Sequence, residues 1–544
     1  MVQLFKSVKG THVRRNKFNL SHEVKLTTEF GRLTPFFVRE TVPGDKYRLS
    51  MDCLVRMAPL YAPIMHRVNL FVHYWYVPCR ILQKNFQPFI TGAEDGNGTV
   101  GANIYHSDPV IANKLFARMK AINSACSGSV NPFQPFEKSS LFDYLGFPAH
   151  SDNQDYDTVS TRPVDILPFQ AYQMIYNEGY RDENFQDRVE LFDDYDGRFG
   201  SDIVEALQSL GTTTSHEQDE IIADLFRLRQ RNWEKDYFTS SLPAPQRGED
   251  TTLGQFDNRI YPNPSDAHHL FDIVNGQADV DAANIARMLE LNSSNNISVN
   301  ELRRALAVQK FKEKLMRFGS RYTEFLRGIF GVRAKDATLQ RPQYLGGGRM
   351  PIVFGEVLQT SETTQNSALG EYAGRGIGAN STQPITKYCD EHGFIMGILS
   401  VMPKPDYCQG WPRMYNRWNK FDYYLPDFAN IGEQEVKQEE LVFNNDPGFD
   451  DWLFGYQSRY AEYKYMPNRV CGDFRETMLD WHMARQFRYR ERNMLNADFL
   501  KVDNDEMDRV FNFRPSGDYD HLWIQIYNNV NALLPMPKFG TPKL

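Results

Sequence analysis

Two segments of the sequence interleave cationic side chains with aromatic rings, a mixture suited to single-stranded nucleic acid. The first holds Arg413, Tyr415, Arg417, Trp418, Lys420 and Phe421, and the second holds Arg485, Phe487, Arg488, Tyr489, Arg490 and Arg492. Bases stack on aromatic faces for about 1 to 3 kcal/mol each, and Arg pairs with phosphate. Because Tyr, Trp, Phe and Arg are also enriched where proteins touch, contact between subunits is the alternative. Both interpretations stay open, with Arg485, Arg488 and Arg490 as candidate phosphate ligands.

A third cationic feature lies at the start of the chain. The first 22 residues contain no acidic residue and five basic residues that we single out: Lys6, Lys9, Arg14, Arg15 and Lys17. The formal net charge of the whole chain is nevertheless -8. A basic arm on an acidic body suits a polyanion, because each cation near a phosphate releases a counterion. The sequence thus predicts a nucleic-acid-binding arm at 1–22, and a solvated terminus is the alternative.

No arrangement with catalytic or metal-binding spacing fits its expected surroundings. The string at 374–379 matches G-x-G-x-x-A, but it falls in a polar stretch without the flanking strand and helix of a dinucleotide site. The acidic run at 503–508 has Asp508 where a calcium loop needs glycine. His268 and His269 are adjacent and lack a further ligand at zinc spacing. We therefore expect no enzyme, no cofactor and no metal.

The composition is that of a water-soluble, aromatic-rich chain, with 41% hydrophobic and 13% aromatic residues among 544. The most apolar run, 394–402, is far shorter than the roughly 20 residues of a membrane-spanning helix, so no membrane insertion is expected. No signal peptide is evident, and the six cysteines show neither CxxC nor zinc spacing. We expect a chain made and kept in the cytosol, with reduced and buried cysteines.

Hydrophobic periodicity predicts strands toward both ends of the chain. Residues 47–57 alternate apolar and polar side chains, so one face should be buried and the other wet. Residues 68–77 are apolar on both faces, which favours a central strand of a packed sheet. Further strands are expected at 394–402, 439–443 and 521–527. The sheet should therefore combine segments that lie far apart in the sequence.

Helices and loops are expected between these strands. Apolar residues at helical spacing predict helices at 108–122, 164–178, 219–233 and 298–322. The glycines at 346–348 should end the helical pattern and open a polar loop that runs to about residue 386. Strands interrupted by long excursions favour a mainly β fold, an eight-stranded jelly roll (β-sandwich) with long helix-containing insertions, over a doubly wound sheet.

Five stretches of the chain resemble one known protein family. Residues 321–348, RYTEFLRGIFGVRAKDATLQRPQYLGGG, closely resemble a block in the major capsid proteins of gokushovirus-type microviruses, small icosahedral phages with single-stranded DNA. The other similar stretches occur in family order, and the resemblance covers nearly the whole chain. They lie at 17–22, 168–187, 236–248 and 458–465.

This resemblance implies a structural subunit of a virion, assembled in the cytoplasm of the host bacterium. Sixty copies would form a T=1 icosahedral viral jelly-roll shell around circular single-stranded DNA. The implied partners are a small basic DNA-packaging protein, a minor pilot protein and a receptor on the host surface. Residues 23–544 would form one capsid domain. Within it, 249–297 lacks family sequence and is the candidate host-attachment protrusion at the three-fold axes, with the helical insertion 189–233 as second candidate.

Two other classes of protein fit parts of the sequence. A β-rich phage appendage that binds a receptor or a glycan would also be soluble, aromatic and free of catalytic motifs. Such fibres usually form trimers, so the mass in solution separates them from a shell subunit. A polysaccharide hydrolase would need a carboxylate pair, and adjacent acids such as Glu439 and Glu440 say nothing about the separation that this chemistry requires. The capsid subunit is the leading interpretation.

Overall fold

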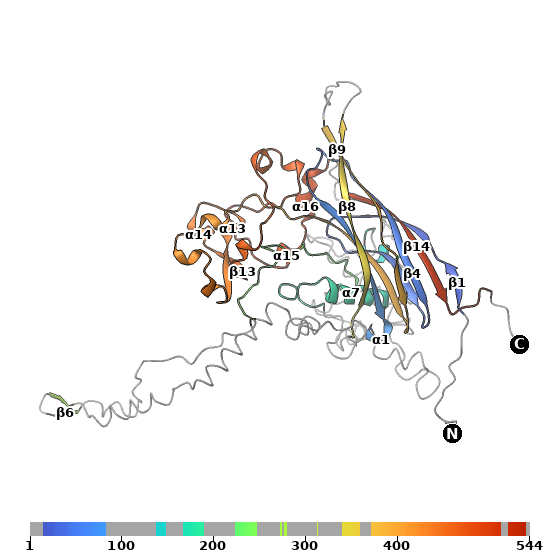
Figure 1. Ribbon diagram of the computed structural model, residues 1–544, viewed down its shortest axis with the longest axis horizontal. Helices are drawn as coiled ribbons and strands as arrows, with labels where there is room; N and C mark the ends of the chain where they lie inside the picture. The colour runs from blue at the N-terminus through green and yellow to red at the C-terminus, as the bar shows by residue number, and fades with distance from the viewer. Residues whose placement is uncertain are drawn as a thin grey trace, which may run out of the picture.

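The computed structural model describes residues 15–82, 138–147, 167–189, 224–246, 272–274, 277–279, 313, 340–358, 372–512 and 520–539. Antiparallel strands dominate this part of the chain and form one large, curled sheet (Figure 1). The arrangement is mainly β and consistent with a jelly-roll sandwich, so the predicted fold class is confirmed.

Ten strands form the main sheet. They are β1 (Asn16–Asn19), β2 (His22–Thr28), β3 (Thr34–Thr41), β4 (Lys46–Met57), β5 (Val68–Pro78), β8 (Gln343–Leu358), β9 (Tyr372–Ser381), β10 (Ile385–Tyr388), β11 (Gly393–Pro403) and β14 (Leu522–Leu534). Their order is β1-β14-β4-β9-β8-β5-β11-β3, with β2 also paired to β14 and β10 to β4. Strands from opposite ends of the sequence, such as β4 and β14, lie side by side, which confirms the expected assembly from distant segments.

Strand β8 belongs to both halves of this sheet. Its residues 343–352 pair with β5, whereas its residues 353–358 pair with β9. Because one strand changes partner along its length, the sheet curls, and its two halves enclose a core. Figure 1 shows β8 and β9 side by side where they rise above the rest of the sheet.

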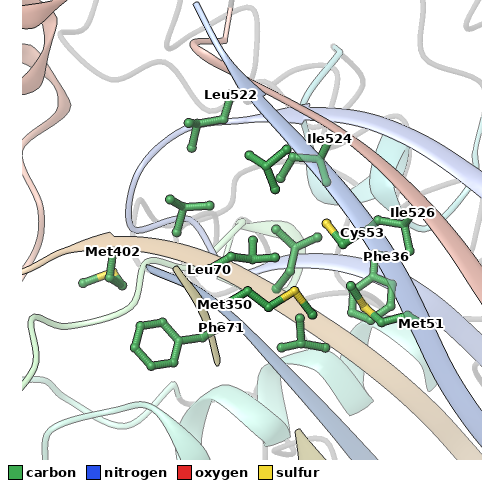
Figure 2. Close-up of a cluster of buried hydrophobic side chains, with 14 of the residues drawn as sticks. Phe36, Met51, Cys53, Leu70, Phe71, Met350, Met402, Leu522, Ile524 and Ile526 are labelled. Carbon is green, nitrogen blue, oxygen red and sulfur yellow. The ribbon is translucent and has the colours of Figure 1, made fainter. Parts of the chain in front are cut away.

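The core between the two halves consists of alternating strand residues. Every second residue of β4 is buried, from Tyr47 to Met57, as the sequence predicted. A buried Leu, Ile or Met of this kind stabilises a fold by about 1.5 to 3 kcal/mol. Figure 2 shows part of this cluster, to which both halves contribute: Met51 and Cys53 of β4, Ile524 and Ile526 of β14, Leu70 of β5 and Met350 of β8.

A helical layer covers the outer face of the half that contains β5 and β11. It consists of α1 (Cys79–Leu82), α5 (Leu141–Tyr144) and α7 (Leu167–Gly179). In β11, Phe394, Met396 and Ile398 pack against this layer, whereas Ile395 and Leu399 pack in the sandwich core. Every residue of β11 is therefore buried. Because β5 and β11 are covered by the core on one face and by helices on the other, both strands are apolar on both faces. Helix α7 confirms the predicted helix at 164–178.

Residues 404–512 form a lobe of short elements, which we call the loop lobe. Figure 1 shows it beside the sheet, in orange to red. Several aromatic side chains from this lobe and from 237–238 form a cluster of their own. The elements are η3 (Arg413–Tyr415), η4 (Lys420–Asp422), η5 (Pro426–Phe428), β12 (Glu433–Lys437), α13 (Gln438–Leu441), α14 (Pro447–Asp450), β13 (Leu453–Ser458), η6 (Ala461–Tyr463), η7 (Gly472–Arg475), η8 (Leu479–Trp481), α15 (Ala497–Leu500), α16 (Asn504–Met507) and η9 (Asp508–Val510). Elsewhere, β6 (Asp272–Val274) and β7 (Gln277–Asp279) form a separate two-stranded sheet.

One secondary-structure prediction is wrong in part and another is wrong throughout. Of the helix expected at 219–233, only 224–226 is helical among the described residues, because the following stretch is drawn into tertiary pairing. There Gln230 forms a bridge with Arg32, and Asn232 with Lys501. The segment expected to be a strand at 439–443 instead contains helix α13. Its two glutamates lie in the first turn, where the positive end of the helix dipole stabilises their negative charge and thereby the helix.

The polar loop expected at 346–386 is also wrong, because this stretch contains β8, β9 and β10 within its described residues. The glycines are needed for close backbone approach. A Cβ atom at Gly347 would lie 2.0 Å from the carbonyl oxygen of Val72, and one at Gly374 would lie 2.3 Å from that of Ala62. The string at 374–379 is therefore part of a strand, still without the helix of a dinucleotide site.

Other predictions fall outside the described residues. The predicted helix at 108–122 lies there, as does that at 298–322 except for position 313. Among the helices that the structure describes, none combines the length and the apolar character needed to cross a membrane.

Candidate assembly surface and nucleic-acid contacts

Exposed apolar side chains are concentrated on one part of the loop lobe. Eleven of the 24 large hydrophobic side chains that are exposed in the described residues fall within 411–431 and 463–466. They form what we call the aromatic surface: Trp411, Met414, Tyr415, Trp418, Phe421, Tyr423, Tyr424, Ile431, Tyr463, Tyr465 and Met466. Trp418 is 86% exposed and Met466 is 81% exposed. Apolar side chains gathered in this way mark a contact site, whereas single exposed ones are ordinary.

Arg417 links the two stretches of the aromatic surface. Its guanidinium lies 4.4 Å from the ring centroid of Tyr463 and 5.3 Å from that of Tyr423. One of its nitrogens is 4.0 Å from a carboxylate oxygen of Glu462. The cation thus fixes two rings and is itself neutralised, so it is a poor ligand for an incoming phosphate.

Hydrogen bonds from tyrosine hydroxyls hold the loop that carries these rings. The backbone N–H of Tyr424 donates to the hydroxyl of Tyr463 (3.4 Å), and that of Leu425 donates to the hydroxyl of Tyr460 (3.3 Å). The Tyr460 hydroxyl in turn donates to the carbonyl of Tyr423 (3.3 Å). The loop therefore presents its rings in one arrangement, although it contains only single-turn helices.

Asp422 fixes the turn on which Trp418 stands. Its Oδ2 atom accepts hydrogen bonds from the backbone N–H groups of Asn419 (2.7 Å) and Trp418 (2.8 Å). These bonds, foremost the one from Asn419, lower the pKa of the Asp422 carboxyl. Trp418, the most exposed ring of the surface, is thus held on a turn that the Asp422 carboxylate caps.

The beginning of the loop is anchored to the body of the lobe. Arg413 pairs with Glu440 (3.1 Å), whose other oxygen accepts a hydrogen bond from the Tyr237 hydroxyl (2.8 Å). Burial raises the pKa of Glu440 against the opposing effect of Arg413. A Cβ atom at Gly410 would lie 1.9 Å from the Glu440 carbonyl oxygen, so only glycine fits there.

The charges around the aromatic surface balance. Residues 411–435 and 458–466 together contain five Lys and Arg residues and five Asp and Glu residues. A polyanion gains little from such a surface, because counterion release requires an excess of cations.

The residues predicted from the sequence end at Phe421 and do not include Tyr423, Tyr424 and Tyr463. Their signal was aromatic residues in a stretch with neither strand nor helix periodicity.

Arg485, predicted as a phosphate ligand, is instead buried in the loop lobe. Its guanidinium lies 4.0 Å from the ring centroid of Phe499, 5.0 Å from that of Phe487 and 5.3 Å from that of Trp233. It also donates a hydrogen bond to the Phe499 carbonyl (2.6 Å). In this conformation Arg485 supports packing and is out of reach of a phosphate.

Arg488 and Arg490, the other two residues predicted in this segment, are exposed. The Arg488 side chain is 82% exposed and lies 3.7 Å from Glu491, an exposed neighbour in sequence. Arg490 has a left-handed backbone (φ 56°), and its N–H donates to the Asn444 side chain (2.6 Å). The exposed ring of Tyr489 lies between them in sequence. This basic turn keeps the combination of cations and a ring that suits nucleic acid.

The N-terminal arm is described only from residue 15. Arg15 lies over the ring of Tyr388 (5.2 Å), and Lys17 is exposed on β1, which pairs with β14. The last residues of the predicted arm at 1–22 are thus part of the sheet. The three remaining arm residues, Lys6, Lys9 and Arg14, lie outside the described residues.

The other candidates from the sequence have structural explanations or lie elsewhere. Asp503 caps α16 by accepting a hydrogen bond from the Asp505 N–H (3.0 Å). Within the described ranges, no group of three or more His, Cys, Asp or Glu side chains is placed to hold a metal ion. His268 and His269 lie outside those ranges. Cys471 is exposed, which corrects the expectation that all cysteines are buried.

The fold and this surface define a class of protein. A curled β sandwich with a helical layer and a large loop lobe, from which a neutral aromatic surface projects, is the architecture of a subunit that contacts other protein. Comparison with known proteins narrows the class. Residues 6–544 match a family described as "Capsid protein (F protein)", and the chain belongs to this family of phage capsid proteins.

Three curated relatives are similar to the chain over nearly its whole length. The capsid protein VP1 of Chlamydia phage 1 is 29% identical, with 100% of this chain and 98% of the relative aligned. The capsid proteins VP1 of Bdellovibrio phage phiMH2K and Spiroplasma virus 4 are each 28% identical, with 99% of this chain and 97% of the relative aligned. The predicted family is thereby confirmed, and with it a structural role in the capsid of a phage virion.

Proposed function

We propose that sixty copies of this chain assemble into a T=1 icosahedral shell around circular single-stranded DNA. The observation that carries the proposal is the capsid-family match across residues 6–544, which spans both the sandwich and the loop lobe. The function is then to bury surface between identical neighbours, without any turnover of a substrate.

A closed icosahedral shell makes specific demands on its subunit. Around five-, three- and two-fold axes, each copy must present several different surfaces, since most contacts join unlike patches. The loop lobe adds surface beyond the sheet, and the aromatic surface is one patch of the required kind. Individual contacts can be weak, because contacts that close one shell reinforce each other through effective concentration.

For the genome, we assign contact to the basic arm and to the basic turn at Arg488 and Arg490. The arm contributes Lys6, Lys9, Arg14, Arg15 and Lys17. Both groups carry an excess of cations, unlike the aromatic surface, and Arg488 projects into solvent. A small basic DNA-packaging protein and a minor pilot protein are the further partners that the family resemblance supports.

For the host, we assign attachment to residues 249–297, with 189–233 as the second candidate. The assignment rests on the polar composition of 249–297 and on its position between two of the family-like stretches. Deletion of 250–296 should leave assembled shells that adsorb poorly to the host bacterium. Shells that fail to form would count against this assignment, and a matched deletion within 189–223 tests the second candidate.

Electron microscopy and mass measurement of the purified protein test the shell directly. Sixty copies of the 63.1 kDa chain have a mass of about 3.8 MDa. Closed icosahedral particles of this mass are expected. A trimer with no tendency to form particles would overturn the shell and favour a receptor- or glycan-binding phage appendage.

Changing the five arm residues together to Gln tests their role. The variant shells should retain less DNA, and the retained amount should depend less on salt, because fewer counterions are exchanged. Retention that equals wild type at every ionic strength would refute a role for the arm. Particle number, measured in parallel, separates weaker DNA binding from weaker assembly.

A further inference from the structure

We infer that the aromatic surface of the loop lobe is a docking site for a second copy of this chain. The inference rests on the proposed shell and names one of the surfaces that join its subunits. Three properties of the described residues support it: the concentration of apolar side chains, the fixed geometry of the loop and the balance of charge.

The apolar side chains are too concentrated to be left in water. Trp418 and Met466 are more than four-fifths exposed, and nine further large exposed apolar side chains lie in the same two stretches, 411–431 and 463–466. Exposed aromatic groups gain about 25 cal/mol for each Å² removed from water. Trp and Tyr are also the residues that dominate binding energy when they are buried in a protein interface.

The loop is ordered before any partner arrives. Tyr460 and Tyr463 hold its backbone through their hydroxyl groups, and Asp422 caps the turn that carries Trp418. Arg417 lies between two of the rings. A partner therefore does not have to immobilise these side chains on binding, and this lowers the entropic cost of association.

The charge balance identifies the kind of partner. Arg413 and Arg417 face Glu440 and Glu462, so these two cations among the rings are already compensated. Nucleic acid would meet no excess of positive charge here, in contrast to the basic turn at Arg488 and Arg490. Two copies of a chain with a net charge of -8 repel each other overall. A neutral apolar patch is the kind of surface through which they can meet with least repulsion.

The capsid family supplies the identity of that partner. A capsid protein must contact further copies of itself, and the matched region of the family includes the whole aromatic surface. A second copy is thus the occupant that the chain's own function requires. The genome and a host receptor are the other occupants to consider. A cross-link to DNA in the test below would indicate the genome, and full assembly of the ring variant combined with poor adsorption to the host would indicate a receptor.

Substitution of exposed rings tests the inference by its effect on assembly. Trp418→Ala combined with Phe421→Ser should reduce the fraction of chain in particles at least about tenfold, because both rings would be removed from the buried centre of a contact. Trp523→Ala, on the outer face of β14, is the matched control for loss of an exposed ring and should assemble as wild type. Urea unfolding of the unassembled chains should show equal stability, since both sites are exposed.

A photoreactive benzoylphenylalanine at position 418 gives a second readout inside assembled particles. A cross-link to another copy of the chain is expected. A cross-link to DNA, or full assembly of the double variant, would overturn the inference while the shell itself stands. If wild-type chain forms no particles at all, the proposed function fails instead, so the two failures are distinguishable.

Discussion

Residues 411–424 and 485–492 contain the same mixture of Arg, Tyr and other aromatic residues, but the structure uses the two regions differently. In the first, Arg413 and Arg417 are paired with carboxylates, and the rings are exposed. In the second, Arg485 is buried among rings, and Arg488 and Arg490 are exposed. The surroundings of each guanidinium, rather than the composition of the segment, therefore decide whether it supports packing, protein contact or DNA.

The largest effect is expected at the base of the aromatic loop. Gly410→Ala places a methyl group 1.9 Å from a backbone oxygen that cannot move aside, so the free energy of unfolding should fall by about 4 kcal/mol. Gly432→Ala is the control: it meets nothing within 4 Å, but it must adopt a φ of 137°, at a cost of about 1 to 3 kcal/mol. Equal stability losses in urea unfolding would show that the loop is not anchored at Gly410.

Arg485 and Arg488 should differ sharply in their effect on stability. Arg485→Ala removes a buried cation that contacts three rings and a carbonyl, so we expect a loss of about 3 kcal/mol. Arg488→Ala should change stability by less than about 0.5 kcal/mol, because its side chain is in water. Urea unfolding of the two variants measures both values. A similar loss for both would remove the distinction between a packing residue and a surface residue.

The cations of the two regions should differ in their contribution to the salt dependence of DNA binding. Arg488→Gln with Arg490→Gln should lower the slope of log affinity for single-stranded DNA against log salt concentration by about 1.4, since each phosphate contact contributes roughly 0.7. Arg417→Gln should leave that slope unchanged. Fluorescence titration with a labelled oligonucleotide gives the slopes. An effect of Arg417→Gln alone would reverse the assignment of the two regions.

The smallest effect is a pH dependence at the base of the basic turn. Burial lowers the pKa of His482, whose Nε2 donates to the Phe474 carbonyl (2.7 Å) while Nδ1 accepts from the Ala484 N–H (3.1 Å). The contribution of this neutral ring to stability is complete above the unfolded pKa of about 6.5. It is lost as the pH falls toward the lower folded pKa.

His482→Gln should therefore flatten the decline in unfolding free energy between pH 7 and pH 5 by at most about 1.4 kcal/mol per pH unit. Urea unfolding at several pH values measures the slope. An unchanged slope would mean that groups other than His482 cause the decline.

Periodic strands could be predicted well because one physical pattern determines them. The alternation in β4 and the doubly apolar run in β5 follow directly from burial on one face or on both. The strands rich in glycine could not be predicted in the same way. Gly347 and Gly374 are required because the carbonyl oxygens of Val72 and Ala62 lie where a Cβ atom would be. These contacts join distant parts of the chain, so the local sequence pattern does not predict them.

The candidate sites were predictable only as residue types. The sequence identified both mixed segments. The burial of Arg485, however, depends on contacts with Trp233 and Phe499, neither of which is its neighbour in the sequence. The pairing of Arg417 with Glu462 likewise joins positions 45 residues apart in sequence. Long-range partners of this kind determine the role of a cation, and periodicity does not reveal them.

Strand β8 has a consequence for how the subunit resists heat and force. Because it is hydrogen-bonded to β5 over one part and to β9 over the other, neither half of the sandwich can detach without disrupting a strand that the other half shares. The two halves should therefore melt together as a single cooperative unit. A container built from such subunits should therefore open by separation between subunits, and not by partial unfolding within one of them.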